Sequence, residues 1–377
     1  MTPGETLEYF EGRRDAIIDQ IREIVEIESP SHDAERSREV VAWIENAARA
    51  TGLELIIERH PTTSDGDHLI IRAFPGDEKP VLLLGHTDTV HPVGTKAKNP
   101  TRIEGDRLYG CGTFDMKANI VLMLEALRYF QVTGTRPRRP INILLSCDEE
   151  VGSYSGREYV EREASAVECC LVFEPSAAGR VKTGRKGTGM YVVAAHGVPA
   201  HAGLDPEKGA SAILELSRQI ERLHAMNSPE TGTTVNVCTA SGGTTTNVIP
   251  EHAECTVDVR FSSMAEAERI DAAIKALTPV DGRVSLEVTG GINRPPMERT
   301  DAVVALFEKA RDIAASFDYE LGETQVGGAS DGNFVGALGI PVLDGLGLAG
   351  NGAHTLHEHI LVSNIAKRAA LVTMLFT

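Results

Sequence analysis

The sequence lacks any apolar stretch long enough to cross a membrane. No segment approaches the roughly 18 to 20 apolar residues that a spanning helix needs. The N-terminus, MTPGETLEYFEGRRDAII, also lacks the basic start and apolar run of a secretory signal peptide. Because both features are missing, we expect a cytoplasmic protein with no membrane partner.

Cysteine is scarce and follows no metal-binding pattern. Six cysteines are spread over the chain without a CxxC spacing, which argues against a structural zinc site. Cys111 and Cys147 lie near the polar motifs described below, but neither has an activating base nearby in the sequence. We therefore expect reduced, mostly buried thiols and no catalytic cysteine.

Basic residues are in deficit. The chain has 37 lysines and arginines against 54 aspartates and glutamates, a formal net charge of −17, so it lacks the basic excess that nucleic-acid binding requires. Hydrophobic residues at 42% and charged residues at 24% are typical of a folded globular protein rather than a disordered one. A length of 377 residues exceeds what one hydrophobic core supports, which predicts two domains.

Strand and helix patterns alternate over the N-terminal half. This alternation predicts an α/β fold in which helices cover both sides of a mixed sheet. Apolar, strand-like runs lie at residues 53–57, 69–73, 81–84, 141–145 and 170–173, and helical patterns lie at residues 7–27, 34–50, 116–130 and 154–162.

The pattern changes near residue 183. Strands expected at 190–195, 233–239, 253–261 and 284–288 and helices at 206–226 and 265–277 follow one another in the order βαββαβ of a ferredoxin-like α+β sandwich. Helix and strand patterns of the first kind then return at 302–315, 332–337, 341–343 and from 363. We predict a catalytic domain in two parts, residues 1–182 and 294–377, interrupted by an inserted α+β lid at residues 183–293.

Acidic residues and histidines follow predicted strands, at the edge where α/β folds place their sites. His86 ends the run VLLLGH, and Asp88 lies two residues later on the same face. Asp115 follows the glycine-bearing segment GCG and precedes a predicted helix, where an N-cap is the alternative role.

Three further segments repeat this arrangement. Residues 148–150 are consecutive acids after a buried strand, and their mutual repulsion requires cations or water nearby, unless they form an exposed acidic turn. Glu174 follows the next strand, and the loop GNGAHTLHE carries His354 and His357. Together these groups supply the nitrogen and oxygen ligands of two zinc ions, which take about four ligands each and share a bridging carboxylate. The histidines favour zinc over magnesium, while cobalt or manganese are possible substitutes.

The ordered motifs HTDTV, GTFDMK, DEEVGS, FEPS and GAHTLHE resemble those of the zinc aminoacylase and carboxypeptidase family. This family includes carboxypeptidase G, acetylornithine deacetylase, succinyl-diaminopimelate desuccinylase and aminoacylase. The resemblance extends over nearly the whole chain and is strongest to carboxypeptidase G and its glutamate-releasing relatives. It implies a di-zinc aminopeptidase-like catalytic domain with an inserted domain that also forms a homodimer.

The resemblance also implies roles for individual residues. Those matching the family's zinc ligands are His86, Asp115 and Glu174 for one ion, with Asp115 bridging, and Glu150 and His354 for the other. Glu149 matches the general base, and Asp88 matches the acid that orients His86. The spacing before Glu358 favours His354 over His357 as the ligand. A cis peptide is expected after Asp115, and the segment Lys117-Ala-Asn departs from the family, whose members often have a pair of glycines there.

In the inserted domain, His201 resembles a histidine that reaches a neighbouring subunit and stabilises the oxyanion. Asn247, Arg260 and Arg294 match substrate-binding residues, since a guanidinium binds a carboxylate through two hydrogen bonds. Backbone donors near Ser330 are a further candidate for that carboxylate. A basic group, Arg180, Lys182, Arg185 and Lys186, is either a second carboxylate site or a solvated hinge.

The resemblance predicts a zinc-dependent hydrolase that cleaves the amide bond before a C-terminal amino acid, with glutamate or another acidic residue as the favoured product. An N-acyl amino acid deacylase is the alternative, because it uses the same chemistry on a different acyl group. A catalytically silent metal-binding regulator is the alternative of another class. The presence of both Glu149 and Asp88 argues against it, since a binding protein needs no general base.

Overall fold

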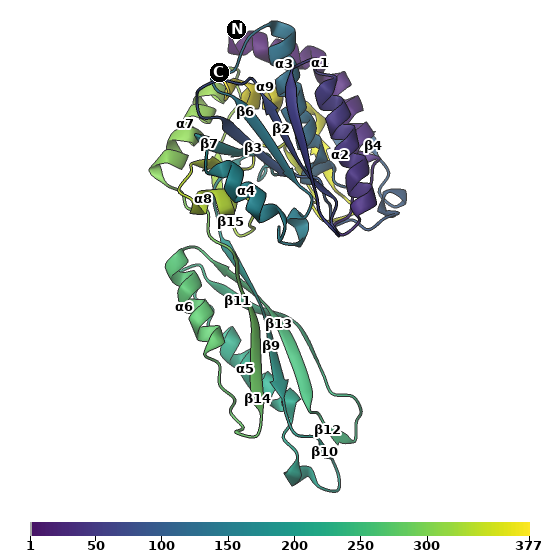
Figure 1. Cartoon of the computed structure of the whole chain (residues 1–377), viewed down its shortest axis with the longest axis vertical. Coiled ribbons are helices and arrows are strands. Elements are labelled where there is room, and N and C mark those ends of the chain that lie inside the picture. The colour runs from purple at the N-terminus through teal and green to yellow at the C-terminus, as the bar shows by residue number, and fades with distance from the viewer. Residues whose placement is uncertain (1) are drawn as a thin grey trace. The chain divides into compact units, whose positions relative to one another are not determined.

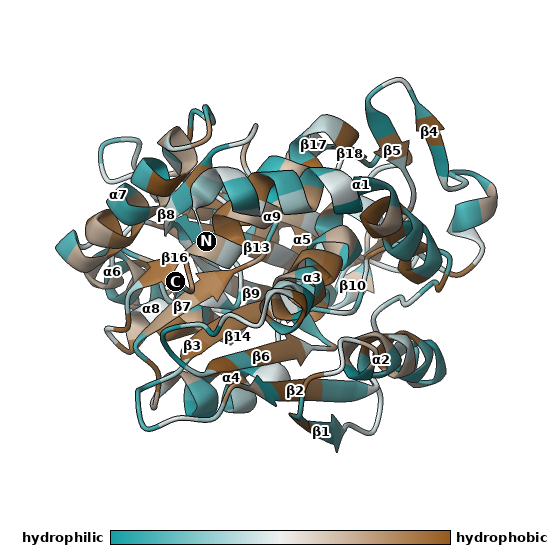
Figure 2. Ribbon diagram, turned by 90° about the horizontal axis from the view of Figure 1, so that it is seen from above, coloured by the Kyte–Doolittle hydropathy of each residue, from teal (hydrophilic) through white to brown (hydrophobic). Residues whose placement is uncertain are grey.

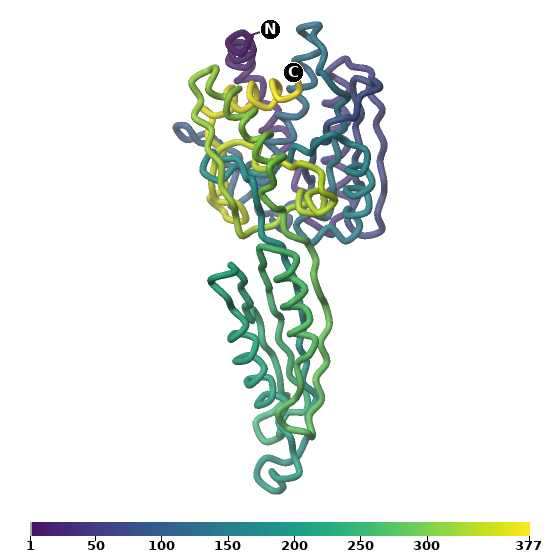
Figure 3. Tube along the Cα trace, turned by 90° about the vertical axis from the view of Figure 1, so that its left-hand side faces the viewer, coloured from purple at the N-terminus to yellow at the C-terminus, as the bar shows by residue number. Residues whose placement is uncertain are grey.

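The computed structural model describes residues 2–377, which form two compact units. Of the described residues, unit 1 contains residues 2–184, 299–325 and 330–377, and unit 2 contains residues 185–298 and 326–329. The colouring of Figure 3 shows that both ends of the chain belong to unit 1, while unit 2 is made from its middle. No helix within residues 2–377 is both long and apolar enough to span a membrane.

Unit 1 is built on a six-stranded mixed sheet in the order β1-β2-β6-β3-β7-β16 (Figure 1). The strands are β1 (Leu55–Pro61), β2 (Asp67–Ala73), β3 (Val81–His86), β6 (Ile141–Ser146), β7 (Cys169–Val172) and β16 (Val342–Leu343). β6, β3, β7 and β16 run parallel, whereas β1 and β2 are antiparallel to their neighbours. All six residues of β3 are buried, as expected for a central strand covered on both faces.

Helices cover both faces of this sheet. Figure 2 shows α1, α3 and α9 on one face and α4 and α8 on the other. The helices of unit 1 are α1 (Pro3–Val25), α2 (Ala34–Arg49), α3 (Ala118–Thr133), α4 (Gly156–Ala164), α7 (Asp301–Ala315), α8 (Gly332–Ala337) and α9 (Ile365–Met374). α1 begins at a capping box between Thr2 and Glu5, and its Ile17, Ile21 and Ile24 recur on one face and are buried in the core.

Short strands complete unit 1. β4 (Arg102–Glu104), β5 (Arg107–Tyr109), β17 (Gly350–Asn351) and β18 (His359–Leu361) form a four-stranded sheet in the order β17-β18-β5-β4. β8 (Val181–Arg185) pairs with β15 (Glu323–Val326), and each contains a point where the chain passes from one unit to the other.

Unit 2 is an α+β sandwich. Its antiparallel sheet has the order β11-β13-β9-β14, formed by β9 (Gly187–His196), β11 (Thr234–Gly242), β13 (His252–Phe261) and β14 (Ser285–Arg294). α5 (Ala212–His224) and α6 (Met264–Lys275) pack against this sheet. A two-stranded ribbon, β10 (Ala200–His201) with β12 (Val248–Ile249), extends from it. The mixed sheet of unit 1 and the βαββαβ order of unit 2 confirm the predicted fold class.

Candidate metal centre

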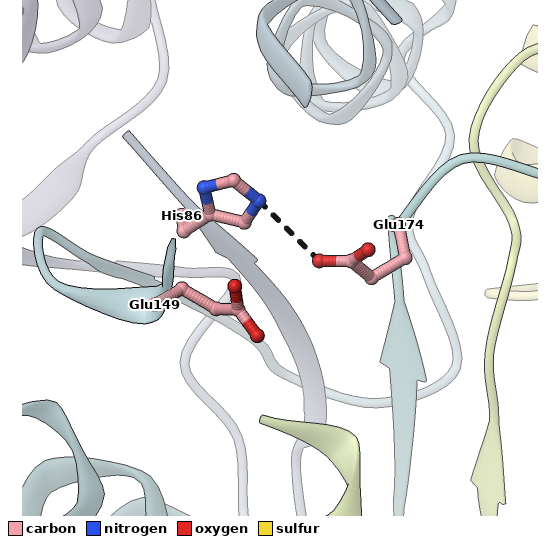
Figure 4. Close-up of side chains that lie close together, drawn as sticks. All are labelled: His86, Glu149 and Glu174. Atoms are coloured by element: carbon pink, nitrogen blue, oxygen red, sulfur yellow. Dashed lines mark ion pairs between the residues drawn. The ribbon is translucent and has the colours of Figure 1, made fainter. Parts of the chain in front are cut away.

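The candidate site lies where three neighbouring strands of unit 1 end. His86 is the last residue of β3, which lies between β6 and β7 in the sheet. Glu149 begins a 3₁₀ turn (η3, Glu149–Val151) after β6, and Glu174 follows β7. Because these strands are parallel, their carboxyl ends meet at one edge, and Figure 4 shows the three side chains converging there.

His86 directs one ring nitrogen at two carboxylates. Its Nε2 lies 3.1 Å from Asp115 Oδ1 and 3.4 Å from Glu174 Oε1. Its Nδ1 lies 3.0 Å from the backbone carbonyl of Asp88 and 3.4 Å from the Asp88 carboxylate. Acceptors lie beside both ring nitrogens. Although burial acts in the opposite direction, the hydrogen bonds with Asp115, Asp88 and Glu174 raise the pKa of His86 well above its ordinary value. A metal ion at Nε2 would take the place of the proton there, while the two acceptors beside Nδ1 keep a proton on that nitrogen.

Asp115 lies between two histidines and uses one oxygen for each. Oδ1 faces His86, and Oδ2 lies 3.4 Å from His354 Nε2. His354 Nε2 is also 3.2 Å from Glu150 Oε2. Donor atoms around a tetrahedral zinc lie roughly 3.3–3.6 Å apart, given the usual bond lengths. The observed separations are close to this spacing, so the donor set fits two adjacent cations with Asp115 between them.

Two groups of three donor atoms show how compact the cluster is. The donor atoms of His86, Glu149 and Glu174 lie within 4.8 Å of one another, and so do those of His86, Asp115 and Glu150. Glu150 Oε1 is buried without a hydrogen-bond partner among residues 2–377, which is costly for a carboxylate unless a cation reaches it. This orphaned oxygen is an independent sign that the site accommodates a metal.

The electrostatics of the site favour a cation. Hydrogen bonds to Asp115 and then to Glu150 raise the pKa of His354 to about 10. Burial raises the pKa of Glu150 above its ordinary value. Although burial acts in the same direction on Asp115, its hydrogen bonds with His354 and His86 hold the pKa of that carboxyl below its usual value. The negative field that stabilises a proton on His354 would equally stabilise a metal ion.

Asp88 orders the segment that carries the acidic side chains. Its carboxylate accepts hydrogen bonds from the backbone N–H of Glu149 (3.2 Å) and Glu150 (3.1 Å) and from the hydroxyl of Ser31 (2.7 Å). The side chain is 2% exposed and also faces His86 Nδ1. Asp88 therefore fixes His86 and the start of η3 together.

The side chains of the three consecutive acids after β6, residues 148–150, have different partners. Asp148 is buried and accepts hydrogen bonds from Ser155 N (2.7 Å), Ser155 Oγ (2.8 Å) and Gly156 N (3.2 Å). Glu149 and Glu150 contribute to the two donor groups instead. The alternative of an exposed acidic turn is wrong, because Asp148 is buried, Glu149 and Glu150 are only partly exposed, and Asp148 faces a different set of partners from the other two.

Asp115 is not a helix N-cap. The bond between Asp115 and Met116 is the expected cis peptide, and α3 begins only at Ala118. His354 and His357 are both exposed, but His354 Nε2 faces the carboxylates of Asp115 and Glu150, whereas the backbone N–H of His357 binds Thr355 Oγ1. His354 adopts a positive φ of 64°, which is uncommon outside glycine.

Sequence reasoning missed the role of Glu358. Its carboxylate is fully buried and accepts hydrogen bonds from three backbone N–H groups, those of Gly112 (2.8 Å), Phe114 (2.8 Å) and Asp115 (2.9 Å). His91 Nε2 lies 2.7 Å from its second oxygen. Glu358 thus holds the backbone of the loop that presents the candidate bridging aspartate. Gly112 has a φ of +72° in this loop, and a Cβ there would lie 2.7 Å from Thr89.

Replacing Glu358 with glutamine is expected to weaken metal binding about 10- to 100-fold, the usual cost of losing a group that orients a ligand. The amide nitrogen would replace an acceptor that now faces Gly112 N–H, so the loop bearing Asp115 would shift. The measurement is chelator competition followed by metal analysis. Glu125→Gln is the matched control. Glu125, on α3, is equally buried, but it forms ion pairs with Arg13 of α1 and Arg128 of α3. Equal loss in both variants would contradict a specific role.

The other predicted site residues lie in two places in unit 2, one at an end of its four-stranded sheet and one on the β10–β12 ribbon. Arg260 on β13 and Arg294 on β14 both pair in register with Thr188 at the start of β9. Arg260 forms an ion pair with Asp258 at 2.7 Å, and Arg294 is 7% exposed and donates to Asn293 Oδ1 at 3.3 Å. The cross-strand register gives Arg260 and Arg294 the same face of the sheet.

His201 and Asn247 lie together on the β10–β12 ribbon. His201 pairs with Val248 in register, and the carbonyl of Asn247 accepts a hydrogen bond from Ala202 N. His201 Nδ1 accepts hydrogen bonds from the backbone N–H of Gly203 and Leu204, both at 3.1 Å. Because Nδ1 is an acceptor, the proton of the neutral ring resides on Nε2, and the side chain is exposed.

Two expectations about neighbouring residues need correction. The backbone N–H of Ser330 binds Asn333 Oδ1, so this donor is used within the segment rather than offered to a ligand. Lys182 and Arg185 are 9% and 5% exposed, so this part of the basic group is buried on β8 and is not a solvated hinge.

Comparison with known proteins gives consistent matches. Residues 82–377 match the family described as Peptidase family M20/M25/M40. Carboxypeptidase G2 of Pseudomonas sp. (strain RS-16) is 30% identical over 371 residues, covering 96% of this chain and 88% of that relative. A succinyl-diaminopimelate desuccinylase of Methylococcus capsulatus is 29% identical over 349 residues, covering 85% of this chain and 90% of that relative.

Solved structures share the fold. Aminopeptidase PepT from Bacillus cereus superposes with a TM-score of 0.76 at 22% identity, covering 96% of this chain and 98% of that one. An M20 family metallo-carboxypeptidase from Sulfolobus solfataricus superposes with a TM-score of 0.74 at 17% identity, with the same coverage. At these identities the structures establish the architecture, and the sequence matches carry the family relationship.

Proposed function

The chain belongs to peptidase family M20/M25/M40 and is therefore a metal-dependent enzyme that hydrolyses amide bonds; we propose that it is a two-zinc carboxypeptidase that releases a C-terminal amino acid, with glutamate favoured. The observation that carries this proposal is Asp115, whose two oxygens face His86 and His354 separately. A bridging carboxylate between two histidines is the arrangement that a two-metal hydrolase needs. The match to carboxypeptidase G2 supports the choice of substrate class.

In this proposal His86, Asp115 and Glu174 would hold one zinc ion, and Glu150 and His354, together with Asp115, would hold the other. A bound zinc pair would polarise the scissile carbonyl and lower the pKa of the attacking water towards neutrality. Glu149 accepts the proton of that water and returns it to the leaving amine. The backbone N–H of Glu149 donates a hydrogen bond to the Asp88 carboxylate, which supports a fixed position for the base.

Substrate recognition is assigned to unit 2. Arg294 binds the substrate carboxylate, with Arg260 on the same face of the sheet beside it. The Nε2–H group of His201 donates a hydrogen bond to the developing oxyanion. This role is supported by the two backbone N–H groups that donate to Nδ1, since they leave the ring proton on Nε2. Asn247 lies beside His201 and contacts the same part of the substrate.

These assignments require a second copy of the chain. Thr188 and His196 are eight residues apart on β9, which corresponds to roughly 26 Å along an extended strand. The arginines flank Thr188, whereas Figure 1 shows the ribbon of β10 and β12 beyond the other end of this sheet. A substrate carboxylate and its neighbouring amide are only a few bonds apart, so the Arg294 and His201 that act on one molecule come from different subunits. We therefore propose a homodimer.

A substrate panel tests the proposal. Zinc-loaded protein is assayed on N-acyl amino acids and dipeptides that differ in the C-terminal residue, with a chelator control. We expect chelator-sensitive turnover concentrated on C-terminal glutamate or aspartate. Turnover that favours small acyl groups, with little dependence on an acidic C-terminal residue, would instead support the deacylase alternative, which the desuccinylase relatives make the second candidate. Absence of turnover on every compound would overturn the proposed substrate class.

A further inference from the structure

A pocket lies at the edge of the unit 1 sheet that is opposite to the candidate metal centre. Val81, Ile141 and Cys169 are the first residues of β3, β6 and β7, and all three line it. His86 and Glu174 lie at the other ends of these strands, so the pocket is separate from the proposed reaction. Its volume is about 240 Å³, smaller than the roughly 300–1,000 Å³ of pockets for drug-sized ligands.

The floor of this pocket is apolar. Val81, Ile141 and Leu171 come from the parallel strands, Leu306 from α7, and Phe376 from the segment after α9. Val81, Ile141, Leu171 and Phe376 are buried, which fixes the shape of the floor. An apolar floor of this size favours a compact hydrocarbon or aromatic group over a hydrated inorganic ion.

The rim carries three cations and one carboxylate. Arg139 pairs with Glu168 at 3.2 Å and with Glu78 at 3.3 Å. Lys309 donates to the Leu375 carbonyl at 3.0 Å, and among residues 2–377 no carboxylate forms an ion pair with Lys309 or with Arg138. The rim thus has a surplus of positive charge on a chain whose net charge is −17.

The rim cations also repel one another. The pKa of Lys309 is lowered, first by partial loss of water around its ammonium and then by the positive charges of Arg138 and Arg139. A bound anion would relieve this repulsion, because it would place a negative charge among the three groups. The geometry of the pocket therefore offers an apolar floor and an anion-attracting rim at the same place.

We propose that this pocket binds a small carboxylate with an apolar body, seated with its hydrocarbon on the strand ends and its carboxylate against Lys309 and Arg138. Such a ligand is recognised by the shape and charge of the pocket alone. The inference does not depend on the substrate proposed for the metal centre.

Calorimetry with octanoate tests the proposal on the full chain. Octanol, octylamine and inorganic phosphate are the comparison probes, since each lacks either the negative charge or the apolar body. We expect saturable binding of octanoate and at least tenfold weaker binding of the other three. Phosphate or octylamine binding as tightly as octanoate would overturn the proposal, because the charge or the apolar floor would then be irrelevant.

Variants locate the site. Lys309→Met and Arg138→Gln are each expected to weaken octanoate binding about three- to fivefold, and the double variant about tenfold, as is usual for exposed charge pairs. Leu306→Trp should abolish binding by filling the floor. Arg136→Gln is the matched control, because Arg136 lies two residues from Arg138 and does not line this pocket.

Alkylation of Cys169 gives a local readout. This cysteine lines the pocket and is 9% exposed, so bound octanoate should slow its modification, measured by mass spectrometry of the corresponding peptide. Modification of the exposed Cys238 in unit 2 should not change. Binding that persists in Leu306→Trp, or that falls equally in Arg136→Gln, would assign octanoate to another surface, the metal centre included, and would overturn the proposal.

Discussion

Replacing Glu149 with glutamine is expected to lower kcat about 10²- to 10⁴-fold, the range over which a general base acts. The amide cannot accept the proton of the attacking water, although it keeps the shape of the side chain. Metal content should equal that of the unaltered protein, because the proposed ligands are untouched. Steady-state kinetics on the preferred substrate and metal analysis of the same preparation measure both outcomes.

The matched variant is Glu150→Gln at the adjacent position. Glu150 Oε2 lies 3.2 Å from His354, and its other oxygen is buried without a partner, so the structure favours this residue as a ligand. Glu150→Gln should therefore lose metal as well as activity. Glu149 also belongs to a compact donor group with His86 and Glu174. If Glu149→Gln lost metal to the same extent as Glu150→Gln, the assignment of Glu149 as base would be wrong.

Part of the site follows from strand periodicity alone. His86, Glu149 and Glu174 are recognisable because each lies at or just after the end of a buried apolar run. Parallel strands bring such ends to one edge, so sequence patterns and topology were sufficient to predict their proximity. The tertiary structure then shows which atoms face one another, as in the division of the Asp115 oxygens between His86 and His354.

Other parts of the site depend on long-range contacts that no local pattern encodes. Glu358 binds backbone N–H groups of residues 112–115, more than 240 positions away, and these donors carry no side-chain signal. Asp148 resembles Glu149 and Glu150 in sequence, yet its carboxylate accepts hydrogen bonds from Ser155 and Gly156, on the other side of η3. The only sequence clue to Glu358 is its place in the motif GAHTLHE.

The fold was predictable where elements are long and periodic. The central strands and α1, α2 and α7 agree with the apolar patterns within a few residues. β4, β5, β17 and β18 contain only two or three residues each, too few for a period to be visible. The helix expected at 206–226 is shorter than predicted, because Ser211 caps α5 and a separate 3₁₀ turn (Pro206–Lys208) precedes it.

The strand pairing in unit 2 leads to the second prediction with a large expected effect, the loss of activity when His201 is replaced. Arg294 lies at one end of the four-stranded sheet of unit 2 and His201 lies on the two-stranded ribbon beyond its other end, so no side-chain rearrangement within a chain brings them to one substrate. His201→Ala is expected to lower kcat about 10²- to 10³-fold, the usual loss when an oxyanion donor is removed. The Nδ1 acceptor bonds from Gly203 and Leu204 would also be lost, so His201→Gln serves as a second variant that retains a donor.

Mixed dimers decide whether His201 acts across subunits. Chains carrying Glu149→Gln and chains carrying His201→Ala, co-expressed with different tags, are each inactive alone. If His201 completes its partner's site, each mixed dimer contains one site with both groups intact, and random assortment restores roughly a quarter of the wild-type activity. If His201 served its own chain, every site would lack one group and no activity would return. Metal content and dimer mass, measured on the same fractions, separate that outcome from failed assembly, so a fully loaded but inactive mixed dimer would disprove the shared site.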